Sequence, residues 1–180
     1  MKEISADKKT FTDDKERYCR LALSMGALNA RVFSLDDIVF DQRTIIKCMY
    51  GCDDWGKGHT CPSREGSLSI AQWREALDRY HWGILIHGDK ARLNQDISYE
   101  LERRAFFDGY YFAFSMSDCK LCATCAGHSG EPCRNIKKAR PAFHSVGIDI
   151  FATVRRFSLP IETLEYEGEP QNWYAAVFVE

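Results

Sequence analysis

Apolar residues recur at helical spacing in four segments of the chain. In the first segment, four apolar residues between 18 and 28 share one face, which predicts a helix capped by Thr12 or Asp13. A second stripe over 70–80 follows Ser67 and Ser69, and either serine is a suitable N-cap. The same period recurs over 93–108 and 148–157. We therefore expect four helices.

Continuous apolar runs predict strands at 82–87, 110–116 and 173–179, with shorter β-like runs at 31–35 and 44–47. The first two runs flank the helix at 93–108. Such a strand–helix–strand unit is usually a right-handed crossover between parallel strands. We therefore expect an α/β fold within a single domain spanning 1–180. It would contain a small sheet of mostly parallel strands flanked by helices, with a cysteine-rich metal-binding lobe.

Four cysteines follow the second of these strands in a loop over 118–141. Cys119, Cys122, Cys125 and Cys133 have the spacing C-x2-C-x2-C-x7-C. A loop of this kind offers a thiolate to successive corners of a 4Fe–4S cluster, as in bacterial ferredoxins. A single zinc ion usually takes two separated C-x-x-C pairs. The spacing favours iron–sulfur over zinc, and either metal over a set of free buried cysteines.

Three more cysteines, Cys48, Cys52 and Cys61, lie in a second cysteine-rich loop over 48–63. Their spacing, C-x3-C-x8-C, is less diagnostic, but three thiols in one glycine-rich loop indicate metal ligands. His59 in the same loop is expected to be a surface group or to support a ligand. Cys19 flanks the apolar face of the first helix and is expected to be a buried apolar residue.

Charge and composition narrow the classes of function. The 180 residues carry a formal charge of −2, so no global field indicates nucleic acid or a membrane surface. No apolar run approaches the ~18 residues of a membrane helix, and the first residues are polar. We therefore expect a cytoplasmic protein. Eight cysteines in a reducing compartment indicate metal or redox chemistry rather than disulfides.

Several segments taken together resemble a known family. They are KCMYGCDDWGKGHTCP, LERRAFFDGYYFAF, CKLCATCAGHSGEPCR, ARPAFHSVGIDIFATVRR and NWYAAVFVE, and they extend over nearly the whole chain. In this combination the sequence is similar to the "predicted metal-binding protein" family, cysteine-rich domains of archaea and anaerobic bacteria. The resemblance implies metal binding and does not itself specify a reaction.

Two arrangements of the seven candidate ligands fit the sequence. In one, the cysteines of 118–141 close one 4Fe–4S cluster, while Cys48, Cys52 and Cys61 hold three corners of a second cluster and leave one iron open. In the other, the chain holds one cluster, or ligands cross between the two loops. We favour two clusters, because the three remaining cysteines need a role.

The predicted function is that of an iron–sulfur protein of anaerobic metabolism, acting in electron transfer or as a reductase subunit. No nucleotide-binding fingerprint is present, so electrons would come from a redox partner protein. One alternative is an enzyme that binds a small-molecule substrate at the open iron. Another is a structural zinc module for contacts with other macromolecules. Whether the chain is an enzyme, and whether it forms a homo-oligomer, stays open; membrane contacts are not expected and nucleic acid is disfavoured.

Charged and titratable residues near the cysteines are weaker candidates. The basic run after Cys133 would stabilise a reduced, anionic cluster or dock an acidic partner, or it is simply a solvated helix face. Three histidines and three aspartates are candidate proton donors or metal-site groups, and each alone is more often structural. The residues in question are Arg134, Lys137, Lys138 and Arg140; His87, His128 and His144; and Asp53, Asp54 and Asp149.

Overall fold

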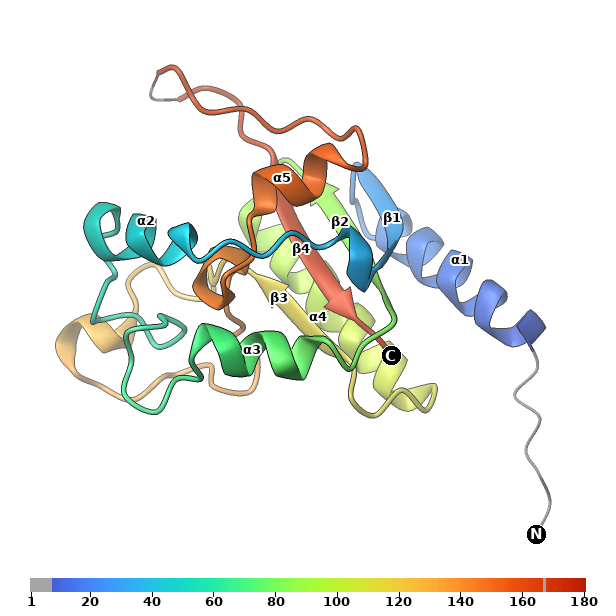
Figure 1. The fold of residues 1–180 in the computed structure, drawn as a ribbon, viewed down its shortest axis with the longest axis horizontal. Coiled ribbons are helices and arrows are strands. Elements are labelled where there is room, and N and C mark those ends of the chain that lie inside the picture. Colours follow the sequence, from blue (N-terminus) through green and yellow to red (C-terminus); the bar gives the residue numbers. More distant parts are fainter. Residues whose placement is uncertain (1–7, 167) are drawn as a thin grey trace, which may run out of the picture.

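Four strands form one sheet in the computed structural model, which describes residues 8–166 and 168–180. In chain order they are β1 (Asn29–Ser34), β2 (Trp82–Gly88), β3 (Phe114–Ser117) and β4 (Trp173–Phe178). Their order across the sheet is β1-β2-β4-β3 (Figure 1). Every hydrogen-bonded pair of neighbours is antiparallel.

The predicted sheet of mostly parallel strands is therefore wrong. β2 and β3 do run in the same direction, as their connection through one helix predicts, but they are not neighbours. β4 lies between them and pairs antiparallel with both, so that Ala176 is opposite Leu85 on one side and Met116 on the other. The residues of an apolar run such as 173–179 do not show which two strands it will lie between. The strand order, and with it the direction of neighbouring strands, was therefore mispredicted.

Helices cover both faces of the sheet (Figure 1). α1 (Lys8–Ser24) and α4 (Ala91–Phe107) pack on one face, while α3 (Ile70–Leu77), α5 (Ile150–Arg155) and the short 3-10 helix η3 (Phe143–Val146) pack on the other. β2 is buried along its whole length. Ile84 and Ile86 join the core beneath α1 and α4, and Leu85 joins the opposite core, as expected for alternating side chains on a central strand.

Several local predictions are confirmed. Ser69 caps α3: its hydroxyl accepts a hydrogen bond from the backbone N–H of Gln72, and the Gln72 side chain accepts from the backbone N–H of Ser69. The predicted strand at 82–87 and helix at 93–108 correspond to β2 and α4. The prediction of Thr12 or Asp13 as the cap of the first helix is wrong, because both lie inside α1, which already includes Lys8.

The strand predictions for two other apolar runs are wrong in whole or in part. The run 44–47 lies within α2 (Arg43–Gly51), whose start is fixed by Asp41, since its carboxylate accepts the N–H of Arg43 at 2.8 Å. The β-branched residues of the run favoured a strand locally. Of the aromatic run 110–116, only the part from Phe114 belongs to β3; the preceding residues form a turn that leaves Tyr111 and Phe112 exposed.

The cysteine loops extend from the end of the sheet where β2 and β3 finish and β4 begins (Figure 1). Among the described residues, no helix combines the length and the apolar character needed to cross a bilayer.

Candidate metal centre

Seven of the eight cysteines line one cavity of about 140 Å³, which we call the cysteine cavity. Both cysteine-rich loops contribute to its wall, although they are separated by α3, β2, α4 and β3 along the chain. The eighth, Cys19, lies on α1 and packs against the core on the other side of the sheet. The cysteines of the cavity are Cys48, Cys52, Cys61, Cys119, Cys122, Cys125 and Cys133.

The first set of thiols is placed by the end of α2. Cys48 lies in the last turn of the helix and Cys52 is the extended residue that follows its end, and both line the cysteine cavity. Burial, together with the negative charges of the Cys52 and Cys61 thiolates, raises the pKa of Cys48 to about 11. Cys52 and Cys61 are therefore close enough to Cys48 to raise the pKa of its thiol. Cys61 also contacts the hydroxyl of Ser63, with 2.8 Å between Sγ and Oγ.

The second loop is closed at its base. The backbone N–H of Ser117 donates to the carbonyl of Pro141 at 3.1 Å, which joins the two ends of the loop. Glu102 on α4 forms an ion pair with Arg140 and accepts hydrogen bonds from the N–H and hydroxyl of Ser115. The loop therefore leaves and rejoins the body of the protein at points that are fixed relative to α4 and β3.

Inside the loop, a second contact with α4 fixes the segment that carries Cys119 and Cys122. The backbone N–H of Lys120 donates to Oε1 of Gln95, a residue that is almost fully buried, at 2.8 Å. Farther along, the side-chain amide of Asn135 donates to Sγ of Cys122 at 3.1 Å. Such a donor stabilises negative charge on sulfur. Sequence reasoning missed both Gln95 and Asn135, because neither belongs to a recognisable motif.

The two cysteine loops also contact each other directly. The ring of His59 hydrogen-bonds the carbonyl of Glu131 at 2.7 Å through Nε2, and the ring of His128 pairs with the carboxylate of Asp54. His59 thus joins the two loops, and it also lines the cavity. These contacts cross from one loop to the other and hold the two sets of thiols on one cavity.

Other candidate residues fall in different places. His144 on η3 lines the cysteine cavity. His87 does not: it is buried in β2, and its two ring nitrogens hydrogen-bond Asn29 and Asn172, which is a structural role. Asp149 caps α5 by accepting from the N–H of Ala152 at 2.9 Å.

The seven thiols and the volume of the cysteine cavity fit a bound group of several atoms. The cavity is about ten times larger than the ~10–15 Å³ that one water molecule requires. Seven thiols exceed the four ligands of a structural zinc ion. Over residues 8–166 and 168–180, no three Cys, His, Asp or Glu side chains lie close enough together to hold a single metal ion. The thiols are thus distributed around the wall of the cavity.

Comparison with known families agrees with a metal-binding role. The family model described as "Predicted metal-binding protein (DUF2284)" matches residues 31–179, which include both cysteine loops. The chain belongs to this family. α1 and Cys19 lie before the matched segment. Neither the curated proteins nor the solved structures contain a match to the chain. All seven cysteines that line the cavity lie within the matched segment.

Proposed function

We propose that the protein is an iron–sulfur protein that acts in electron transfer, or as a small reductase subunit, and that the cysteine cavity holds two 4Fe–4S clusters. The observation that carries this proposal is the gathering of seven thiols from two distant loops on one cavity. The spacing of the cysteines in 118–141 supports one cluster with four thiolate ligands. Cys48, Cys52 and Cys61 line the same cavity and would be the ligands of the second cluster.

The residues of the chain have defined roles in this proposal. The seven thiolates hold the metal, and clusters of this kind supply one-electron transfer when bound. Asn135, through its hydrogen bond to Cys122, supports the more negative, reduced state. Of the basic run after Cys133, Arg140 is engaged with Glu102, while Arg134, Lys137 and Lys138 remain on the surface. These three cations would attract an acidic redox partner.

Single cysteine substitutions test the proposal. Cys122→Ser and Cys52→Ser, each in protein purified without oxygen, should lower the iron and acid-labile sulfide content by about half if the two sets hold separate 4Fe–4S clusters. Cys19→Ser is the matched control and should leave both counts unchanged, because Cys19 lies outside the cavity. Loss of all iron in either variant would indicate one shared cluster. Zinc without sulfide in the unsubstituted protein would contradict the proposal.

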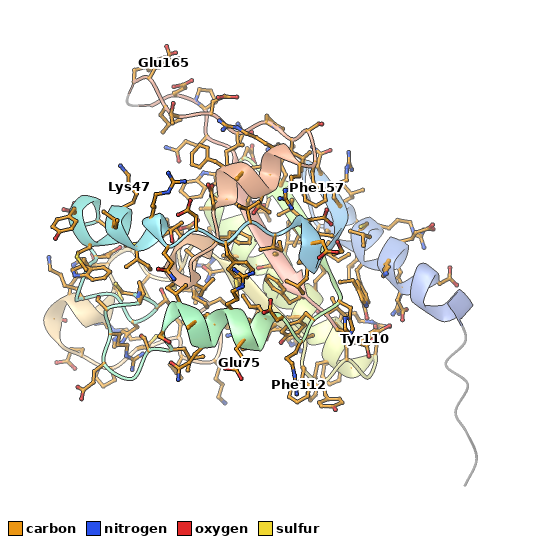
Figure 2. All side chains as sticks on the ribbon, in the orientation of Figure 1. Lys47, Glu75, Tyr110, Phe112, Phe157 and Glu165 are labelled. Atoms are coloured by element: carbon orange, nitrogen blue, oxygen red, sulfur yellow. The ribbon has the colours of Figure 1, made fainter. Side chains whose placement is uncertain are left out.

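A second candidate function, an enzyme that binds a small molecule at the three-cysteine set, is favoured by one specific observation. Cys48 and Cys52 line not only the cysteine cavity but also a groove of about 880 Å³ between α2 and α5. His144 lines both spaces, and Lys47, which points outward from α2 in Figure 2, lies along the groove. A small anion could thus reach the three-cysteine set from solvent.

Ligand titration separates this second candidate from pure electron transfer. Small thiols and carboxylic acids, added to the iron-loaded protein, should change its EPR spectrum if the three-cysteine set accepts them. Phe151→Trp, which enlarges a side chain lining the groove, should weaken that change without lowering the iron content. A spectrum that does not respond to any of these ligands would leave electron transfer as the function.

A further inference from the structure

Four large aromatic side chains project into solvent within seven residues at the end of α4. Phe106, Phe107, Tyr111 and Phe112 are 55%, 73%, 69% and 70% exposed. Figure 2 shows Phe112 at the edge of the molecule, far from α2. The rings contact one another rather than the core: Phe106 packs edge-on against Phe107, and Tyr111 packs against Phe112. Contiguous exposed apolar surface of this kind usually marks an interaction site.

An apolar groove of about 510 Å³ lies beside these rings. Its walls come from α3, the turn before β3 and the end of the chain, and Tyr111 and Phe112 form one rim. Aromatic side chains line most of it. Those that contribute are Trp73, Tyr80, Tyr110 and Phe114. We call the groove and the four exposed rings together the aromatic face.

The aromatic face is held in a fixed shape. The hydroxyl of Tyr80 donates to the carbonyl of Phe112 at 2.5 Å, and the hydroxyl of Tyr110 donates to Asp14 on α1 at 2.8 Å. These bonds fix the turn between α4 and β3 from both sides. The rings therefore present a preorganised surface, which lowers the entropy lost when a partner binds.

We propose that the aromatic face is the interface of a symmetric homodimer, and that its occupant is a second copy of this chain. The face carries both parts of a self-complementary contact, since the protruding rings of Tyr111 and Phe112 form the rim of a groove large enough to receive aromatic side chains. A two-fold axis places the rings of each copy against the groove of the other.

Charge at the groove supports this choice of partner. Arg79 and Glu180 line the same groove and have opposite charges. A two-fold arrangement that set Arg79 of each copy opposite Glu180 of the other would form two equivalent ion pairs. An anionic membrane or a strongly acidic protein would instead select a groove of one charge. The dimer also leaves both cysteine cavities free, because the cysteine loops lie at the opposite end of the sheet from the turn before β3 (Figure 1).

The mass of the full chain in solution tests the proposal. Sedimentation velocity should give twice the 20.7 kDa of one chain at micromolar concentration. Phe107→Ser and Phe112→Ser should each weaken the dimer by at least about tenfold, as expected for anchoring aromatic residues. Tyr50→Ser is the control, because Tyr50 is 83% exposed on α2, away from the face, and this variant should remain dimeric. Circular dichroism checks that each variant is folded.

A charge exchange gives an independent readout. Arg79→Glu and Glu180→Arg should each weaken the dimer, and the double variant should restore it. A chain that sediments at 20.7 kDa at about 100 μM would overturn the proposal. So would a dimer that survives both ring substitutions, or a monomer that co-sediments with phosphatidylglycerol vesicles.

Discussion

Gly127 and Lys57 come from different cysteine loops, yet their backbones are in direct contact. A Cβ atom on residue 127 would lie 1.9 Å from the carbonyl oxygen of Lys57, much closer than any real Cβ contact. Glycine is therefore required at 127 for the loops to close on each other, and closure is what brings the two sets of thiols to one cavity.

Gly127→Ala should separate the loops and weaken metal retention. Overpacking of this kind disfavours the closed state by about 1–3 kcal/mol, which corresponds to retention weaker by roughly fivefold to a hundredfold. Iron release to a chelator, followed by absorbance, measures the effect. Gly58→Ala is the control within the same pair of loops, because a Cβ there would meet its neighbours at 3.6 Å, an ordinary contact. Equal iron release from the two variants would show that loop closure does not govern metal retention.

Glu102 should contribute strongly to stability through Arg140. Both side chains are only 13% exposed, and Glu102→Ala leaves the guanidinium and Ser115 without their shared acceptor. We expect a loss on the order of 3 kcal/mol in the free energy of unfolding, measured with urea. Glu100→Ala, which breaks an exposed pair with Arg103 on the same helix, should cost less than about 1 kcal/mol. Similar losses from the two variants would count against the role given to Glu102.

Asp108 should make the free energy of unfolding depend on pH in the acid range. Burial alone would raise the pKa of Asp108, but the hydrogen bond from Tyr18 and the charges of Arg17 and Arg104 outweigh it and lower the pKa. The stability that the carboxylate contributes is present above its unfolded pKa of about 3.9 and is lost as pH falls through the lower, folded value. Asp108→Asn should therefore be less stable than the native chain at neutral pH.

Urea unfolding at several pH values tests the direction of this pH dependence. The difference in unfolding free energy between the native chain and Asp108→Asn should be constant above about pH 5 and should shrink below about pH 4. A difference that does not change between neutral and acid pH would mean that the network of Tyr18, Arg17 and Arg104 does not depend on the charge of Asp108.

Asn135 should raise the midpoint potential of the proposed redox centre. Its amide donates to Sγ of Cys122 at 3.1 Å, and a donor to sulfur favours the reduced state. Asn135→Ala should therefore lower the midpoint potential in an EPR-monitored redox titration while leaving the iron content unchanged. An unaltered potential would indicate that the hydrogen bond does not influence the metal centre.

The candidate ligands could be read from the sequence more directly than the strand order of the sheet. The spacing of Cys119, Cys122 and Cys125 is a local signal, and a loop of three thiols has few uses other than metal binding. That the second set, near Cys48, would share a cavity with them depends on contacts such as that of Gly127 with Lys57, which no local pattern encodes. Asn135 and Gln95 were missed for the same reason, since their partners are set by the tertiary fold.

Local signals also explain which elements were assigned correctly. Ser69 and Gln72 form a capping box that can be read from four residues. The strand order cannot be read in this way, because β4 comes from the far end of the chain and inserts between β2 and β3. The run 44–47 shows a local preference overridden by its surroundings, since its β-branched residues form part of α2.

An iron, sulfide and zinc count on the full chain, purified without oxygen, tests the central claim most directly, with an EPR spectrum of the reduced protein. The account predicts about eight iron and eight sulfide per chain and the spectrum of reduced 4Fe–4S clusters. Zinc as the only metal, with no acid-labile sulfide and no EPR signal, would contradict the claim that the cysteine cavity is an iron–sulfur site.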